Sequence, residues 1–271
     1  MNQRLFCTCI LFAQDESDEP VRFAFESSYL INQQTVLMPY QGSLNFQLQH
    51  RFGLVENGIT DIFGIYATAN TRLGLDYGIT DKLMVGAGTT RDYKLQDINW
   101  KYQILQQTQS GSMPVFLTYY GNFVIDAREN SVFYPEENYR FIHRFSYFTQ
   151  LLVARKFNDA ISLQVAPNFI YFNAVKPGVN NIHYGLSASG RARFTSSLSA
   201  IVEYDQLLSE NEATEIYPNL SVGLEIGTAT HAFHIYISNY NQIIPQRNFV
   251  FNTNNPWDGK FLIGFNVMAI L

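Results

Sequence analysis

The chain has 271 residues, a net charge of −5 and only 15% charged residues, against roughly 25% in a typical soluble domain. No strongly basic patch is present, which argues against a nucleic-acid-binding protein, and no run approaches the roughly 18 apolar residues of a membrane-spanning helix. The 17 Tyr and 22 Phe with so few charges favour a β-barrel whose outer face meets lipid and whose ends carry aromatic girdles.

The chain begins with a segment typical of a secretory signal. MNQR carries one Arg, an apolar stretch covers Leu5–Ala13, and the acidic run DESDE follows Gln14. A positive start, an apolar middle and a small residue at the cleavage point define such signals, so we predict a signal peptide over 1–13; a buried N-terminal strand is the alternative. Both cysteines, Cys7 and Cys9, lie in it, so the cleaved chain would hold no disulfide or thiol nucleophile.

Residues 14–42 precede the first regular strand. The stretch VRFAFESSYLIN within them could form a thirteenth strand, but bacterial single-chain barrels have an even number. We therefore expect a periplasmic or lumen-plugging segment over 14–42 and a barrel over 43–271.

Strict alternation begins at SLNFQLQHRFGL, where Leu44 and Phe46 share one parity and Asn45 and Gln47 the other. Successive side chains of a strand point to opposite faces, so this segment fits a wall that is apolar towards lipid and polar towards water. Similar segments follow to the C-terminus, and we predict twelve strands over residues 43–54, 70–78, 82–90, 97–106, 114–124, 140–156, 160–172, 181–194, 198–207, 219–227, 232–240 and 261–271.

The connections alternate between short and long. Short ones lie at 78–81, 157–159, 195–197 and 228–231, and long ones at 55–69, 125–139, 173–180, 209–218 and 241–259. This rhythm is typical of outer-membrane barrels, and an open sheet edge would leave unpaired backbone groups in hydrocarbon. The predicted fold is all-β: a single closed antiparallel transmembrane β-barrel of about 12 strands, with short periplasmic turns and longer extracellular loops.

Several phrases together resemble a family of outer-membrane β-barrel proteins of unknown function from Bacteroidota. They are INQQTV at 31–36, HRFG at 50–53, LGLDYGITDKLMVGAG at 73–88, MPV at 113–115 and GTATHAF at 227–233. The resemblance implies a barrel in the bacterial outer membrane and carries over no catalytic residue.

The polar parity of the strands is assigned to the lumen. It includes charges of both signs, and Arg144 is assigned to the same face. The predicted lumen-lining residues are Gln47, Gln49, Arg51, Arg72, Asp76, Arg191, Arg193, Glu203, Asp205 and Glu225. They could line a water-filled pore or form a salt-bridged network in a closed interior, and twelve strands lie between the filled and the open cases.

The leading hypothesis is a passive or gated channel for small polar solutes, with outer-membrane lipid around it. The alternative is a non-conducting barrel that acts as a scaffold or docks another envelope protein, and a hydrolase is a distant third. His143 and Ser146 could serve a hydrolase, but their spacing of three places them on opposite faces of a strand, so we expect no enzyme. His231 and His234 have the same spacing and no clustered carboxylate or cysteine, so we expect no metal and no cofactor.

Overall fold

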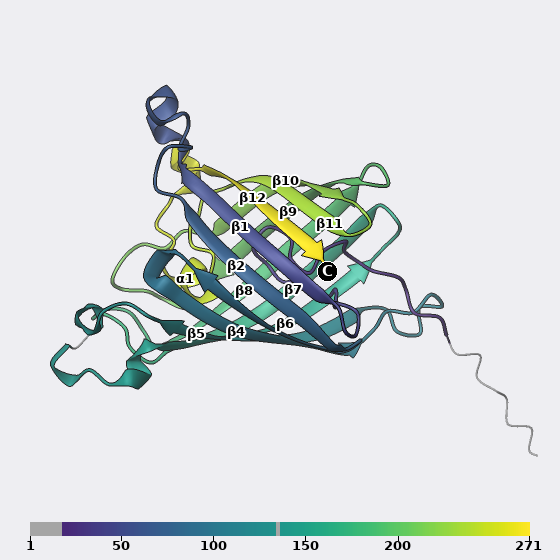
Figure 1. The fold of residues 1–271 in the computed structure, drawn as a ribbon, viewed down its shortest axis with the longest axis horizontal. Coiled ribbons are helices and arrows are strands. Elements are labelled where there is room, and N and C mark those ends of the chain that lie inside the picture. Colours follow the sequence, from purple (N-terminus) through teal and green to yellow (C-terminus); the bar gives the residue numbers. More distant parts are fainter. Residues whose placement is uncertain (1–17, 134–135) are drawn as a thin grey trace, which may run out of the picture.

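The computed structural model describes residues 18–133 and 136–271, and the predicted signal peptide lies outside the described residues. Twelve antiparallel strands close into one barrel, because β1 pairs with β12 as well as with β2 (Figure 1). The strands are β1 (Leu44–Leu54), β2 (Asn70–Thr80), β3 (Leu83–Thr90), β4 (Leu95–Leu105), β5 (Phe116–Asp126), β6 (Phe145–Lys156), β7 (Ile161–Phe172), β8 (Ile182–Arg193), β9 (Leu198–Leu207), β10 (Asn219–Gly227), β11 (His231–Ser238) and β12 (Leu262–Ile270).

The remaining described elements are short and lie on the long-loop side of the barrel. They are the α-helix α1 (Pro245–Val250) and the 3-10 turns η1 (Val55–Asp61), η2 (Asp92–Lys94), η3 (Asn130–Val132), η4 (Glu136–Asn138), η5 (Phe141–Arg144) and η6 (Pro256–Asp258). None of the helices in the described part of the chain is both long and apolar enough to span a membrane.

The predicted twelve-stranded barrel is confirmed, and most strand boundaries agree within about two residues. The exception is the strand predicted over 140–156, which begins at Phe145. Residues 141–144 form the 3-10 turn η5, in which the His143 ring accepts a hydrogen bond from the Arg140 backbone N–H at 3.2 Å. Arg144 is therefore not a lumen residue, and its guanidinium donates to the carbonyl oxygens of Asp126 and Arg128 in the neighbouring loop.

Alternation fixes which side chains face lipid. In β7, Leu163 and Val165 are exposed on the outside, whereas Ser162 and Gln164 are buried inside. Aromatic pairs join neighbouring strands near their extracellular ends, such as Phe169 with Tyr184, whose ring centroids are 5.6 Å apart. These rings match the aromatic girdle expected at a membrane interface.

The lipid-facing assignment predicts a depth-dependent cost of charge. Val165 lies near the middle of β7 with 49% exposure, and Ile182 begins β8 with 45% exposure. We expect Val165→Arg to lower the free energy of unfolding by about 2–4 kcal/mol and Ile182→Arg by no more than about 1 kcal/mol. Urea titration in phospholipid vesicles measures both, and equal costs would contradict the assignment.

The inside of the barrel is filled. Buried apolar side chains of β5, β6, β7 and β9 pack against residues from the N-terminal segment and from α1 in one cluster. Two segments thus enter the barrel: residues 24–36 before β1, and the β11–β12 loop that carries α1. The 241–259 loop lies at the long-loop end of the barrel, as predicted, but folds back into the lumen, so that Phe249 and Val250 of α1 are buried inside.

Candidate functional site

The N-terminal segment forms a small hairpin inside the barrel, here named the lumenal hairpin (residues 27–36). The Thr35 N–H donates to the Ser28 carbonyl at 2.9 Å, and the Leu30 N–H donates to the Gln33 carbonyl at 3.0 Å. The segment reaches β1 through a turn at 40–43, so it enters from the end at which the C-terminus also lies (Figure 1). That end carries the short turns and faces the periplasm.

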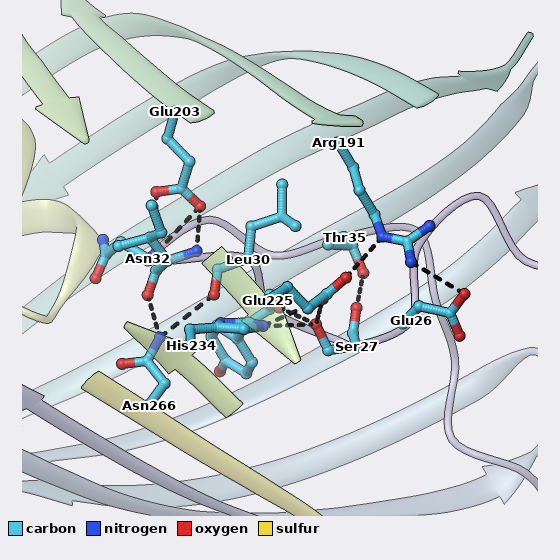
Figure 2. A network of polar contacts seen from close by, with 12 residues as sticks. Glu26, Ser27, Leu30, Asn32, Thr35, Arg191, Glu203, Glu225, His234 and Asn266 are labelled. Carbon is cyan, nitrogen blue, oxygen red and sulfur yellow. Dashed lines mark hydrogen bonds and ion pairs between the residues drawn. The ribbon is translucent and has the colours of Figure 1, made fainter. Parts of the chain in front are cut away.

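The tip of the lumenal hairpin, residues 31–33, binds one carboxylate of the barrel wall. The backbone N–H groups of Ile31, Asn32 and Gln33 donate to Glu203 of β9 at 2.7, 2.9 and 3.0 Å (Figure 2). Consecutive backbone N–H groups that converge in a turn form an anion-binding concavity. The Tyr240 hydroxyl, 3.3 Å away, is a further donor to Glu203. Among the described residues no cation lies within ion-pair distance of this buried carboxylate, and the hairpin backbone supplies most of its hydrogen bonds.

Side chains on other strands hold the same tip. Asn266 of β12 donates to the Ile31 carbonyl at 2.7 Å, and Gln33 donates to Asp205 at 2.8 Å. The Arg51 guanidinium donates to the Asn32 side-chain oxygen at 2.5 Å. Three separate parts of the wall are therefore bound by residues 31–33.

The two arms of the hairpin are also bound. The Lys101 ammonium donates to the carbonyl oxygens of Leu37 at 2.9 Å and Thr35 at 3.1 Å. Gln164 of β7 donates to the Gln34 carbonyl at 2.8 Å, and Asn45 of β1 donates to the Ser28 hydroxyl at 2.7 Å. Apolar contacts accompany these bonds, since Phe25, Leu30 and Ile31 belong to the interior cluster.

A charged network surrounds the start of the hairpin. Glu225 Oε1 accepts from Arg191 at 2.6 Å. Its Oε2 accepts from Ser27 at 3.0 Å and lies 3.2 Å from His234 Nε2 (Figure 2). Arg191 also pairs with Glu26 at 3.1 Å. The N-terminal segment thus places the Glu26 carboxylate, just before the hairpin, next to Arg191 and Arg193 of β8.

A second network lies between β1, β2 and β4. Gln49 links it to the hairpin tip, because it accepts from Arg72 at 3.4 Å and donates to the Ile31 carbonyl at 3.5 Å. Arg72 makes a bidentate pair with Asp97 at 2.7 and 2.8 Å and donates to Gln47 at 3.1 Å, and Gln47 donates to Asp76. Glycines make room for it: a Cβ on Gly88 would lie 2.4 Å from an Arg72 nitrogen, and one on Gly86 would lie 2.0 Å from Asp76. The repeated glycines of LMVGAG therefore accommodate large charged side chains in the lumen.

The ten residues predicted to line the lumen all lie on inward-facing positions of the strands. Nine are buried, with 7% exposure or less, and Arg193, at the periplasmic end of β8, is partly exposed at its side chain (32%). The lumenal hairpin contacts Arg51, Glu203, Asp205 and Glu225, and Gln49 donates to its Ile31 carbonyl. Arg191 pairs with Glu26, just before the hairpin, and Gln47, Arg72 and Asp76 belong to the second network. Nothing in INQQTV itself indicates these partners, because some of the contacts join residues close in the chain, such as Asn32 with Arg51, and others join distant ones, such as Asn32 with Glu203.

The extracellular end is closed by the loop that carries α1. Gln246 of α1 donates to Asn122 of β5 at 2.7 Å, and the Phe249 ring lies 6.0 Å from the Phe148 ring of β6. Arg51 donates to the Gln242 carbonyl of the same loop. Hairpin and loop therefore share Arg51 and the apolar cluster, so the two closures meet inside the barrel.

The N-terminal segment is also fastened where it leaves the barrel. The Val21 N–H donates to the Gln107 carbonyl at 2.7 Å, and the Gln109 N–H, in the β4–β5 turn, donates to the Glu19 carbonyl at 2.9 Å. Hydrogen bonds from Ser110 and then Ser112 hold the pKa of the exposed Asp18 carboxyl below its ordinary value.

A cavity of about 1050 Å³ opens among the extracellular loops above α1. Its lining combines aromatic rings with four basic and two acidic side chains. His143 and Ser146 both border it, so their predicted placement on opposite faces is wrong, because η5 replaces the start of the strand. No hydrogen bond joins these two side chains within the described ranges.

His231 and His234 lie on opposite faces of β11, as their spacing of three predicts. His231 is exposed at the start of β11, and His234 is buried beside Glu225. Among residues 18–133 and 136–271, no group of three or more potential metal ligands is present.

A closed antiparallel barrel with an apolar outer band and a polar, filled interior defines a β-barrel protein of the outer membrane. Residues 25–271 match the family described as "Membrane bound beta barrel domain (DUF5777)". The chain belongs to this family, and the match includes the lumenal hairpin. No curated protein matches the sequence.

Several solved structures resemble this chain at low sequence identity. The KdgM porin in complex with disordered oligogalacturonate has a TM-score of 0.51 and 8% identity, over 84% of this chain and 98% of that one. The COG4313 outer membrane channel from Pseudomonas putida F1 has a TM-score of 0.48 and 9% identity, over 86% and 97%. LpxR from Salmonella typhimurium has a TM-score of 0.42 and 11% identity, over 83% and 99%.

Proposed function

We propose that this protein is a gated channel for small polar solutes, in which the lumenal hairpin is the gate. The single observation that carries the proposal is the character of the wall behind the hairpin. Glu203, Asp205, Lys101 and Arg51 are buried charges whose hydrogen-bond partners include groups on the N-terminal segment. A permanently filled interior needs no such charges, since buried ion pairs and charges are weak sources of stability.

The proposed open state follows from these contacts. When the hairpin leaves towards the periplasm, water replaces its backbone groups as the hydrogen-bond partner of the charged side chains on the wall. These charges therefore remain solvated in the open state. The lumen-lining residues named above then border a polar passage with charges of both signs, which favours polar solutes over apolar ones. The α1 loop must shift as well, because it packs on the same cluster as the hairpin.

A reversible cross-link tests the gate. The Ser28 hydroxyl and the Asn45 side chain are in direct contact at 2.7 Å, so Ser28→Cys with Asn45→Cys should form a disulfide in the oxidising periplasm. We expect the oxidised protein to be silent in planar lipid bilayers and the reduced protein to show discrete openings. The single variant Ser28→Cys is the matched control and should not respond to reductant.

Two outcomes oppose the proposal. Equal conductance of the oxidised and reduced forms would show that the hairpin is not the gate. Silence of both forms would favour the second hypothesis, a non-conducting barrel that acts as a scaffold or docks an envelope partner, which the filled interior also fits.

A further inference from the structure

The extracellular cavity carries an excess of positive charge. Its four basic side chains include Arg128, Arg144, Lys176 and Arg247, against two carboxylates. One of these, Asp126, is already held by Arg128 through both oxygens, at 2.9 and 2.6 Å. The remaining cations therefore exceed the free carboxylates at this mouth of the barrel.

Arg247 of α1 is fixed in place but not neutralised. Its guanidinium carbon lies 3.6 Å from the ring centroid of Tyr93 and 4.9 Å from that of Phe251. Its Nε is buried without a hydrogen-bond partner, and no carboxylate of the described residues lies within ion-pair distance of this side chain. Because the aromatic rings contact the faces of the guanidinium, its edge, which carries the N–H donors, is left to bind an oxyanion. An anion bound there would offset the free-energy cost of a buried cation without a partner.

Arg144 places a second fixed cation at the cavity. Its guanidinium donates to the carbonyl oxygens of Asp126 and Arg128 at 2.7 and 2.6 Å and to the Asn130 side chain at 2.6 Å. These neutral acceptors orient the group without cancelling its charge, and it has no carboxylate partner in the part of the chain that the structure describes.

The apolar lining defines the rest of the ligand. Phe145, Phe172 and Phe251 border the cavity, and Phe172 and Phe251 pack together with ring centroids 5.6 Å apart. A cavity near 1,000 Å³ is at the upper end of the range for small-molecule sites. Most of its lining comes from the extracellular loops, so a ligand arrives from water.

We propose that this cavity binds a small organic anion, with a carboxylate or phosphate group on the edge of Arg247 and an apolar or aromatic body against Phe172 and Phe251. The site goes beyond the proposed gating function, because binding needs no open lumen. Its presence or absence therefore leaves the cross-linking test unaffected.

Equilibrium dialysis against the full barrel in lipid nanodiscs tests the site. Naphthoate and naphthyl phosphate serve as carboxylate and phosphate probes, naphthamide as the neutral isostere, and empty nanodiscs correct for lipid partitioning. We expect at least one of the two anions to bind at one site per barrel and naphthamide to bind at least about tenfold more weakly, because a hydrogen bond to a charged group is stronger than a neutral one.

Two variants address the residues. Arg247→Gln should weaken anion binding by about tenfold or more, and Lys176→Glu, at an exposed position, should weaken it several-fold without disturbing the fold. Arg155→Gln, near the periplasmic end of β6, should leave binding unchanged. Equal binding of naphthamide and the anions, or wild-type binding by both Arg247→Gln and Lys176→Glu in barrels with unchanged circular dichroism, would overturn the proposal.

Discussion

Replacing Glu203 with alanine is expected to release the lumenal hairpin from the barrel wall. This carboxylate accepts the backbone N–H groups of Ile31, Asn32 and Gln33, all within 3.1 Å. A hydrogen bond to a charged group contributes about 1.5–3 kcal/mol, so the loss of two or more of these bonds costs about 3 kcal/mol or more. At about 1.4 kcal/mol per factor of ten, the open hairpin becomes at least a hundredfold more populated.

Hydrogen exchange of the hairpin amides measures this opening directly. Residues 27–36 should exchange about a hundredfold faster in Glu203→Ala, while β2 and β3 keep wild-type protection. Glu203→Gln keeps a neutral acceptor oxygen and should have a smaller effect. Glu215→Ala, in the exposed 208–218 loop, is the control and should have none.

Conductance gives an independent readout of the same change. If the hairpin is the gate, Glu203→Ala should open in bilayers far more often than the wild type. Wild-type exchange rates in the hairpin of Glu203→Ala would show that the hydrogen bonds between its backbone N–H groups and Glu203 are not what holds the hairpin inside the barrel.

Replacing Arg72 with alanine is expected to destabilise the barrel itself. Arg72 is 3% exposed and makes a bidentate pair with Asp97, which is 2% exposed. Removal of one partner leaves a buried charge uncompensated, at a cost of about 3–5 kcal/mol. Urea unfolding in lipid vesicles measures the loss, and Trp100 of β4, three residues after Asp97, reports on the same strand.

The double variant Arg72→Met with Asp97→Leu is the matched control. Replacement of a whole buried pair by apolar side chains of similar volume is often neutral or stabilising, so the double variant should recover most of the loss. A double variant as unstable as Arg72→Ala would show that neighbours such as Gln47 and Asp76 depend on this guanidinium.

The barrel could be predicted from the sequence because its signal is local. In each strand, apolar and polar residues alternate with a period of two, which shows which residues lie on which face. A shift of the register by one residue would move every side chain to the opposite face. Leu163 and Gln164 reveal by parity alone which meets lipid and which faces inwards. The predicted strand start at 140 failed because Phe141 and Ile142 continue an apolar pattern within a 3-10 turn.

The contents of the lumen could not be predicted in this way. Inward positions such as Leu152 and Ile170 are apolar and fully buried, yet on their strands they are indistinguishable from lipid-facing residues. Their partners, Leu30 and Phe249, come from the segment before β1 and from the β11–β12 loop, which no alternation links to these positions. The same holds for Arg247, whose place at the extracellular cavity depends on a loop that folds inwards.

The sequence alone thus determined the closed wall, the direction of each strand and the inward side of the ten predicted lumen residues, since these follow from nearest-neighbour alternation and from the need to pair every backbone group in hydrocarbon. Only the tertiary structure decided which charges share partners and what fills the interior. The Ile31–Glu203 bond spans 172 residues, and contacts at such separation depend on how the closed cylinder places its strands around the hairpin.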